Sequence, residues 1–355
     1  MKLSFIFIFF ILINSTLNAQ NGGLKLLPPD EGYIYHGAFP FMGNTEDVVS
    51  KDRIEMFESA AGKKIAWVNF SNNWYNGIIF PSNEVRLISS MGKVPYIRLM
   101  PRSDYNTFKP DALYTYDNIL KGKFDKELHK WAADAGKTGI PLMIEFGTEV
   151  NGNWFPWSGI WNGGRTKSFG DKDLADGPEK FRETYRHIID IFRDEKAYNI
   201  TWVYHPNGVS APDESWNSVD AYYPGDDYID WIGVSVYGSQ HPGTYWYEFD
   251  DIMSKSYNSM KKISTNKPMA VFEFGVTEDP TVGNKAEWIV SALSSFISRR
   301  YPLIKAISYF QTDFKNSDGT ITDLKINSSE SSQSAYRNLI QSILFVEKAK
   351  IGRLN

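Results

Sequence analysis

The sequence has no cysteine among its 355 residues and little excess of charge of either sign. The missing thiols exclude disulfides, thiol catalysis and lipid attachment at an N-terminal cysteine. The 38 Lys and Arg residues nearly balance the 42 Asp and Glu residues, and no basic run stands out. Nucleic acids and anionic membranes are therefore not expected partners. With 42% hydrophobic and 15% aromatic residues, the composition is that of a globular protein that binds neutral or weakly charged molecules.

The N-terminus has the features of a secretory signal peptide. Lys2 precedes an apolar run over residues 5–13, and Leu17, Asn18 and Ala19 form a small-residue cleavage site. The apolar run is much shorter than the ~20 residues that cross a bilayer. We therefore expect a signal peptide at 1–19 and a secreted or periplasmic mature chain at 20–355, with no membrane insertion after cleavage.

Short apolar segments rich in β-forming residues alternate with amphipathic helical patterns along the rest of the chain, which predicts parallel strands joined by crossover helices. Eight strands are expected, and eight is the number of a (β/α)8 TIM barrel. We predict one α/β barrel domain, acting as a monomer. The strands are expected at 33–39, 64–70, 94–100, 142–146, 200–204, 231–237, 269–274 and 304–310, and helices at 51–61, 82–91, 124–135, 178–194 and 332–348.

The long connections all follow strands: 101–123, 147–177, 206–228 and 311–331. In barrels of this type the loops after the strands build the active face. These long loops, which are rich in Trp, Tyr, Asn and Gly, are therefore expected at one end of the barrel, around the site.

The fourth predicted strand reads LMIEFGTEVNG from Leu142. Alternation of side chains along a strand places its apolar residues toward the helices, and Glu145 and Glu149 toward the barrel axis. Burying a carboxylate is costly unless it is paired or functional. We expect Glu145 to be a structural ion pair with Arg98 on the neighbouring strand, and Glu149, one layer higher, to be functional.

The seventh predicted strand reads MAVFEFG from Met269. The same alternation sends Ala270, Phe272 and Phe274 outward and Glu273 into the barrel. Two acids, Glu149 and Glu273, thus reach the strand-end face from strands on opposite sides of the barrel.

Glycoside hydrolysis requires a pair of carboxyl groups at one cleft. One protonated carboxyl donates to the leaving oxygen, and one carboxylate attacks the sugar or activates water. With Glu273 as nucleophile, its charge would raise the pKa of Glu149 and keep Glu149 a proton donor.

Aromatic and amide side chains are dense after Glu149 and at nearby strand ends. Exposed rings bind the flat apolar faces of sugars, while amides and hydroxyls bind their OH groups. The substrate contacts that we predict, in order, are Trp154, Trp157, Tyr237, Asn151 and His205. Tyr237 is also placed to hydrogen-bond a neighbouring carboxylate. Part of the aromatic set, including Trp74, Tyr75, Trp216, Tyr222 and Tyr223, is equally compatible with packing at the barrel rim.

These residues resemble glycoside hydrolase family 26, a clan A family of retaining (β/α)8 enzymes dominated by β-mannanases. The resemblance covers most of the mature chain, and its specific pieces are GTEVNGNWFPWSG from Gly147, YYPGDDYIDWIGVSVYG from Tyr222 and MAVFEFG from Met269. It implies Glu149 as acid/base, Glu273 as nucleophile, Trp154 as a sugar-stacking ring and Tyr237 as the tyrosine beside the nucleophile. It further implies a secreted endo-β-glycanase that acts on β-1,4-mannan, or alternatively on mixed-linkage β-glucan or β-1,3-xylan.

Two positions depart from the family pattern. The residue before the acid/base, usually His, is Thr148, and the eighth strand ends in ISYFQTDF, which leaves Tyr309, Phe310 or Phe314 in place of a common Trp. Both lie close to the expected substrate, so they bear on specificity rather than on hydrolysis.

Two other classes of protein remain as alternatives. A metal-dependent barrel hydrolase could use His36, His205, His241 and Asp313, but the first strand lacks the His-x-His pair of such sites. A non-catalytic glycan-binding barrel would also carry aromatics, yet pure binding gives no reason for two acids so close. No cofactor or metal is implied, and a calcium loop at 314–324 lacks its first ligand and its chelating Glu.

Overall fold

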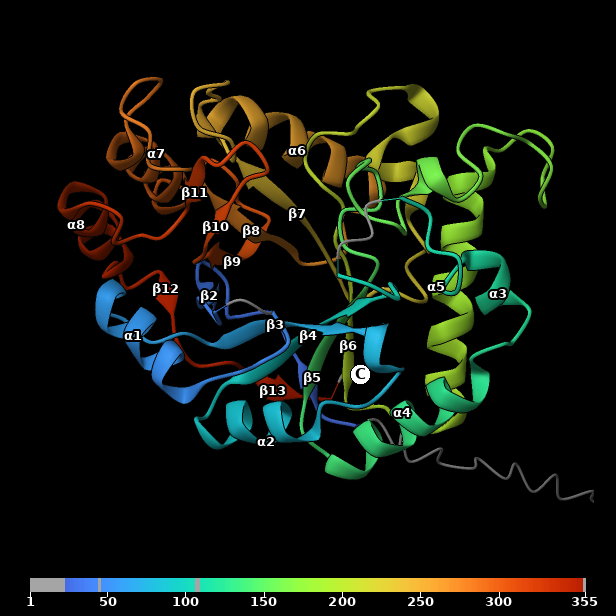
Figure 1. Cartoon of the computed structure of the whole chain (residues 1–355). Helices are drawn as coiled ribbons and strands as arrows, with labels where there is room; N and C mark the ends of the chain where they lie inside the picture. The colour runs from blue at the N-terminus through green and yellow to red at the C-terminus, as the bar shows by residue number, and fades with distance from the viewer. Residues whose placement is uncertain (1–22, 44–45, 106–108, 354–355) are drawn as a thin grey trace, which may run out of the picture.

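The computed structural model describes residues 23–43, 46–105 and 109–353, so the expected signal peptide at 1–19 lies outside the described residues. Eight parallel strands form a closed barrel, because each pairs with the next and the last pairs with the first (Figure 1). The predicted TIM barrel is confirmed. The barrel strands are β2 (Ile34–Phe39), β3 (Trp67–Asn73), β4 (Val94–Met100), β5 (Leu142–Phe146), β6 (Ile200–Tyr204), β7 (Trp231–Tyr237), β8 (Met269–Gly275) and β9 (Ile304–Phe310).

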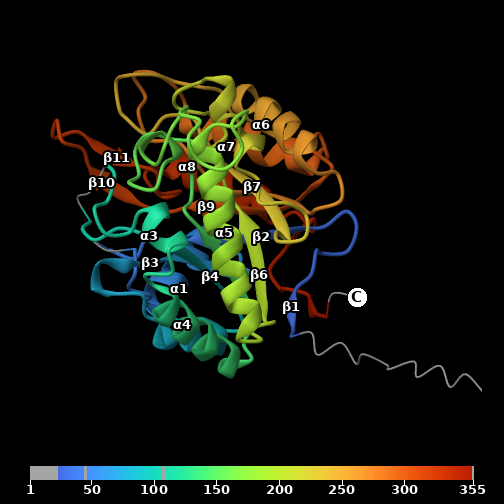
Figure 2. The ribbon, with the colours of Figure 1, turned by 90° about the vertical axis from the view of Figure 1, so that its right-hand side faces the viewer.

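Helices surround the barrel, and Figure 2 shows the long α5 lying across its outer face. The crossover from β6 to β7 differs from the others, because in the described chain it carries only the short 3-10 helices η3 (Ser215–Asn217) and η4 (Val219–Tyr222). The α-helices are α1 (Lys51–Ala61), α2 (Ser82–Ser90), α3 (Tyr116–Leu120), α4 (Asp125–Thr138), α5 (Asp176–Asp194), α6 (Phe249–Ile263), α7 (Lys285–Ile297) and α8 (Glu330–Ile340).

Two helix ends differ from the prediction. Helix α4 runs through Gly136 and ends at Gly139, which adopts the left-handed conformation (φ 61°) that glycine accepts without strain. At Gly136, inside the helix, an added Cβ would lie 3.4 Å from the Cα of Ala197, which is an ordinary van der Waals contact. The last helix stops at Ile340, and the chain then adds the short strand β12 (Phe345–Val346) beside β2.

The end of the barrel at which its strands begin is filled by apolar side chains. A cluster of buried rings, including Tyr35, Trp67, Tyr96 and Trp231, packs inside it with Phe272. Strand β1 (Lys25–Leu26) pairs with β13 (Ile351–Gly352) across this end, and Leu26 joins the cluster. The interior of this end is therefore a packed apolar core.

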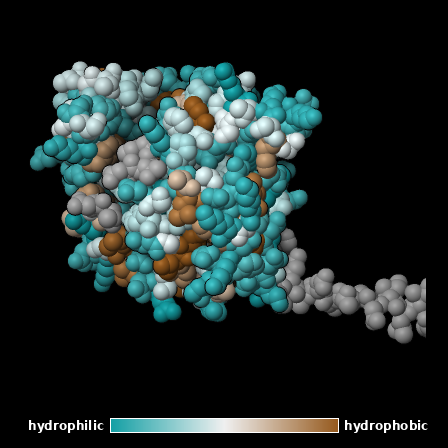
Figure 3. Space-filling model, turned by 45° about the vertical axis from the view of Figure 1, so that its right-hand side comes forward, coloured by the Kyte–Doolittle hydropathy of each residue, from teal (hydrophilic) through white to brown (hydrophobic). Residues whose placement is uncertain are grey.

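The opposite end carries the long segments that follow the strands, including the hairpin of β10 (Asp313–Lys315) and β11 (Ile321–Asp323) (Figure 1). The face in Figure 3 is mostly hydrophilic, with apolar residues in small groups. Within the described ranges, none of the helices combines the length and apolar character that crossing a membrane requires.

Candidate active site

Glu149 is placed by an unusual turn after β5. The chain leaves the strand through Gly147 (φ 63°), and Glu149 itself adopts a positive φ of 53°, which is uncommon for a residue with a side chain. Its amide donates to the carbonyl of His205 at 2.8 Å, which ties the turn to the end of β6. Strain of this kind is typical of functional sites, where the surrounding structure enforces it.

Two neutral donors hold the Glu149 carboxylate, which is only 7% exposed. The indole nitrogen of Trp154 lies 2.7 Å from one oxygen, and the amide nitrogen of Asn207 lies 2.8 Å from the other. Trp154 thus contacts the acid directly and leaves part of its ring open to the cleft.

Glu273 points into the barrel, but not for the reason that strand alternation gave. Ala270 and Phe272 belong to the barrel interior and Val271 packs on the helix side, which is the reverse of the predicted parity, whereas Phe274 packs on the helix side as predicted. The register between β7 and β8 skips Phe272, so that Ser235 faces Glu273. This bulge turns two consecutive side chains inward, and it is what brings Glu273 to the mouth of the barrel.

The Glu273 carboxylate receives a charged and a neutral hydrogen bond. Arg98 Nη1 donates to Oε1 at 2.6 Å, and the hydroxyl of Tyr237 donates to Oε2 at 2.7 Å. Burial nevertheless raises the pKa of Glu273 to about 7; the charges of Arg98 and His205 lower it, and Glu149 raises it further. We expected the charge of Glu273 to raise the pKa of Glu149. The structure instead shows an effect in the other direction, in which Glu149 raises the pKa of Glu273.

Arg98 is the cation that organises the floor of the site. Its second nitrogen donates to Glu46 at 2.7 Å and to Ser71 Oγ at 2.9 Å. The rings of Phe39 and Phe310, stacked at 4.5 Å, lie 5.4 and 5.5 Å from the guanidinium. Of the three aromatic candidates at the end of the eighth barrel strand, Phe310 is thus the one that lies beside Arg98, the partner of Glu273.

Glu145 has different partners from those predicted. Arg98 donates hydrogen bonds to Glu273 and Glu46. Glu145 instead accepts a hydrogen bond from the Tyr96 hydroxyl and lies 2.7 Å from Nδ1 of His205. Burial lowers the pKa of His205, but the charges of Glu145, Glu273 and Glu149 outweigh it and raise the pKa. The expected ion pair with Arg98 is therefore corrected to a buried His205–Glu145 pair.

Three of the five predicted substrate contacts are buried under the site. Trp157 is 1% exposed, Asn151 0% and His205 3%. Trp157 Nε1 donates to the carbonyl of Thr148, and Asn151 Oδ1 accepts from the amide of Asn207. These geometries correct the expectation of direct sugar contact: the three side chains position the residues above them.

Asn207 and a pair of tyrosines were missed at the sequence level. Asn207 bonds Glu149, and Tyr245 and Tyr247 line a pocket of about 190 Å³ together with Trp154 and Tyr237. The two rings lie 5.2 Å apart and are 38% and 51% exposed. The signal that could have found them was the aromatic density of the loop after Tyr237.

The residues of the alternative metal site do not come together. His36 is buried against Tyr336 and the Lys64 carbonyl, and burial lowers its pKa to about 3. Asp313 pairs with Lys325. Over residues 23–43, 46–105 and 109–353, no three His, Cys, Asp or Glu side chains are grouped to hold a metal ion.

Comparisons with known proteins agree with this geometry. The sequence model of glycosyl hydrolase family 26 matches residues 110–264. Endoglucanase H of Acetivibrio thermocellus is 29% identical over 294 residues, 82% of this chain and 29% of that protein. A mannan endo-1,4-beta-mannosidase of Bifidobacterium adolescentis is 29% identical over 198 residues, 51% of this chain and 18% of that protein. The chain thus spans less than a third of the length of either relative.

Solved structures share the barrel. The catalytic domain of the Bacillus sp. JAMB-750 GH26 endo-beta-1,4-mannanase superposes with a TM-score of 0.64 over 89% of this chain and 87% of that one, at 17% identity. At this identity the likeness shows the fold. Taken with the match of the glycosyl hydrolase family 26 model over the segment that carries Glu149 and Tyr237, these findings show that the chain is similar to that family in sequence and shares the barrel fold of the solved structure.

Proposed function

We propose that this protein is a retaining endo-β-glycanase with Glu149 as acid/base and Glu273 as nucleophile. The observation that carries the proposal is the pair itself. Two buried acids from opposite sides of the barrel meet at one mouth: Asn207 donates to Glu149 and forms a β-bridge with Ser235, and Ser235 pairs with Glu273. Glycoside hydrolysis uses both carboxyl groups and therefore accounts for the cost of burying them at one site.

The reaction would proceed by double displacement. Glu149 donates its proton to the glycosidic oxygen while the Glu273 carboxylate attacks the anomeric carbon, so that the bond to the leaving sugar breaks and a glycosyl ester forms. Water then gives a proton to Glu149, attacks the same carbon and releases Glu273. Arg98 and Tyr237 hold the attacking carboxylate, and Trp154 and Asn207 hold the acid.

We propose β-1,4-mannan as the first substrate, since the family resemblance and the mannan endo-1,4-beta-mannosidase relative both support it. β-Glucan is the second candidate. The specific observation in its favour is that the relative named Endoglucanase H aligns over 82% of this chain. Thr148 before the acid also supports a changed sugar preference, because its hydroxyl lies 3.3 Å from the buried His205 instead of presenting an imidazole.

The test is reducing-sugar release from β-mannan, mixed-linkage β-glucan and β-1,3-xylan by the wild type, Glu273→Ala and Glu149→Ala. Added azide separates the two roles. In Glu273→Ala it attacks from the nucleophile's face and gives the glycosyl azide of opposite configuration, whereas in Glu149→Ala it gives the retained azide. Release by Glu273→Ala at the wild-type rate would overturn the assignment, and binding without release by the wild type would favour the non-catalytic barrel.

We also propose that the protein is exported. Lys2, the apolar run at 5–13 and the small residues at 17–19 support cleavage before Gln20. Mass spectrometry of the protein recovered from the medium or periplasm of the expressing cell should give a chain that begins at Gln20. A chain retained in the cytoplasm with residues 1–19 attached would contradict this.

A further inference from the structure

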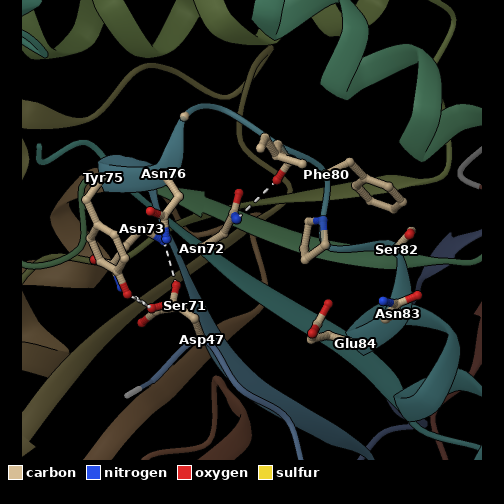
Figure 4. Close-up of a pocket in the computed structure, with 13 residues that line it drawn as sticks. Asp47, Ser71, Asn72, Asn73, Tyr75, Asn76, Phe80, Ser82, Asn83 and Glu84 are labelled. Atoms are coloured by element: carbon tan, nitrogen blue, oxygen red, sulfur yellow. Dashed lines mark hydrogen bonds between the residues drawn. The ribbon is translucent and has the colours of Figure 1, made fainter. Parts of the chain in front are cut away.

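A second pocket, separate from the one beside Trp154, lies between the loop after β3 and the first turn of α2 (Figure 4). Its volume is about 380 Å³, which is within the range of small-molecule sites. One wall carries Tyr75 and Asn76, and the other carries Ser82, Asn83 and Glu84 (Figure 4).

The floor of this pocket is fixed by hydrogen bonds. Asp47 accepts from the backbone and side-chain nitrogens of Asn73 at 2.7 and 2.8 Å, and from the hydroxyl of Tyr75 at 2.6 Å. A site built this way loses little freedom when a ligand binds, because its shape exists beforehand.

Other polar groups on the walls are free. Asn76 and Asn83 are exposed, and within the described chain neither carboxamide makes a hydrogen bond. A carboxamide offers two donors and one acceptor. The pocket thus presents paired donors and acceptors that are satisfied only by solvent or a ligand.

The charges of the lining identify the chemistry of that ligand. The described residues that line the pocket include the acids Asp47 and Glu84 but no Lys, Arg or His, so a phosphate or carboxylate ligand is disfavoured. Both Asp47 oxygens already accept hydrogen bonds from Asn73 and Tyr75, and among the described residues no three His, Cys, Asp or Glu side chains are grouped to hold a metal ion. Carboxamides, hydroxyls and the apolar side chain of Ile79, 63% exposed, suit a neutral polyhydroxyl molecule with an apolar face.

The pocket adjoins the catalytic network on the side of the nucleophile. Ser71 lines it, and the Ser71 hydroxyl accepts from the Arg98 nitrogen that also bonds Glu46, while the other Arg98 nitrogen bonds Glu273. The pocket beside Trp154 lies instead among the groups that hold Glu149.

We propose that this pocket binds one sugar unit of the glycan chain away from the bond being cleaved, with Asn76 and Asn83 as the side chains that bind its hydroxyls. The inference rests on the proposed function, since it assigns a further contact to the same substrate. It predicts that long glycan chains bind more tightly than short ones because they reach both pockets.

The experiment measures binding without turnover, by electrophoresis of Glu149→Gln protein through gels that contain β-mannan, mixed-linkage β-glucan or β-1,3-xylan. Asn76→Ala/Asn83→Ala in that background should raise the Kd for the retarding polymer about tenfold, as expected for the loss of two hydrogen bonds. Asn266→Ala is the matched control, because Asn266 is exposed and lies before β8, at the opposite end of the barrel. Its Kd should stay that of the parent.

Chain length provides the second readout. With Glu149 intact, the ratio of kcat/KM for a hexasaccharide to that for a trisaccharide should fall in the double variant. An unchanged Kd and an unchanged ratio, with wild-type hydrolysis present, would overturn the pocket alone. If the parent neither binds nor cleaves any of the three polymers, the proposed function and this inference fall together.

Discussion

The two ends of the barrel interior are built from the same eight strands, yet one is packed with apolar side chains and the other contains buried charges. Where the strands begin, buried rings such as Trp67 and Trp231 pack together, and the indole of Trp67 is satisfied by Ser308 at 3.3 Å. Where the strands end, Arg98, Glu145 and Glu273 are buried, and Nε of Arg98 and Oε1 of Glu145 have no partner among the described atoms.

This contrast separates the residues that stabilise the fold from those that we propose for the chemistry. Apolar contacts at the strand starts stabilise the barrel, and the free energy that they contribute allows a costly set of charges at the strand ends. The strained Glu149 turn and the bulge in β8 both lie at the charged end. Substitutions at the two ends should therefore have opposite signatures, and the following measurements test that from the largest expected effect to the smallest.

The sharpest test is Glu273→Ala at the charged end. We expect kcat to fall by more than about 10³-fold, because the nucleophile is lost, while far-UV circular dichroism and the melting temperature stay near those of the wild type, since Arg98 keeps Glu46 as a partner. Glu55→Ala, on exposed α1, is the control for removal of a carboxylate. A melted protein would mean that this end also maintains the fold.

The converse test is Trp67→Ala at the apolar end. The side chain is 0% exposed, and its loss leaves a cavity, so the free energy of unfolding should fall by about 3–5 kcal/mol. Denaturant unfolding measures this, and titration of active sites with a slow substrate gives turnover per folded molecule, which should change little. If the folded variant has lost its turnover, the apolar end also contributes to activity, and the proposed division between the two ends is wrong.

Glu145→Gln tests the layer between the ends. The change removes the charged partner of the buried His205 imidazole, so the free energy of unfolding should fall by about 2–3 kcal/mol. Expressed as free energies, the loss of turnover per folded molecule should be smaller than the loss of stability, because Glu145 forms no hydrogen bond with Glu149 or Glu273. If the variant is as stable as the wild type but has lost activity, Glu145 has a role in catalysis and not only in stability.

Trp154→Phe removes one donor from the acid and keeps an aromatic ring. We expect kcat/KM to fall about tenfold, in proportion to one hydrogen bond to a charged group. Trp161→Phe is the matched control, since its indole donates only to the carbonyl of Asn153 at 3.2 Å. An equal loss in both variants would show that the loop as a whole, and not the bond to Glu149, is responsible.

The smallest effect concerns pH. Because the pKa of Glu273 is raised to about 7 by burial, kcat/KM should fall on the acid side of about pH 7 as the nucleophile becomes protonated. Tyr237→Phe removes a hydrogen bond that lowers this pKa, so the acid limb should move to higher pH by less than about one unit. Tyr245→Phe, which bonds no carboxylate, should leave the limb in place.

The same titration affects stability, with a sign that follows from the raised pKa. Protonated Glu273 is favoured in the fold, so its contribution to stability is full below about pH 4.5 and is lost as the pH rises through about 7. Glu273→Gln, which cannot titrate, should remove this dependence from the difference between the two unfolding free energies. An unchanged pH dependence would show that another group titrates.

Much of the architecture followed from local pattern. Alternation and turn residues located all eight strands, and only β3 begins three residues later than expected. The same alternation placed Tyr237 and Glu273 correctly, but it failed for Ala270, Val271 and Phe272, since a bulge shifts the register of β8 between Val271 and Phe274. Sequence pattern cannot reveal a bulge, because that depends on how the neighbouring strand pairs.

The sequence by itself determined that strands and helices alternate, that Glu149 and Glu273 lie at strand ends, and that aromatic residues gather after them, because these properties depend on neighbours along the chain. Only the tertiary structure decided that Arg98 holds Glu273 instead of Glu145, that Trp157, Asn151 and His205 are buried, and that Asn207 completes the site. Those outcomes depend on distances between residues tens of positions apart, which closure of the barrel alone establishes.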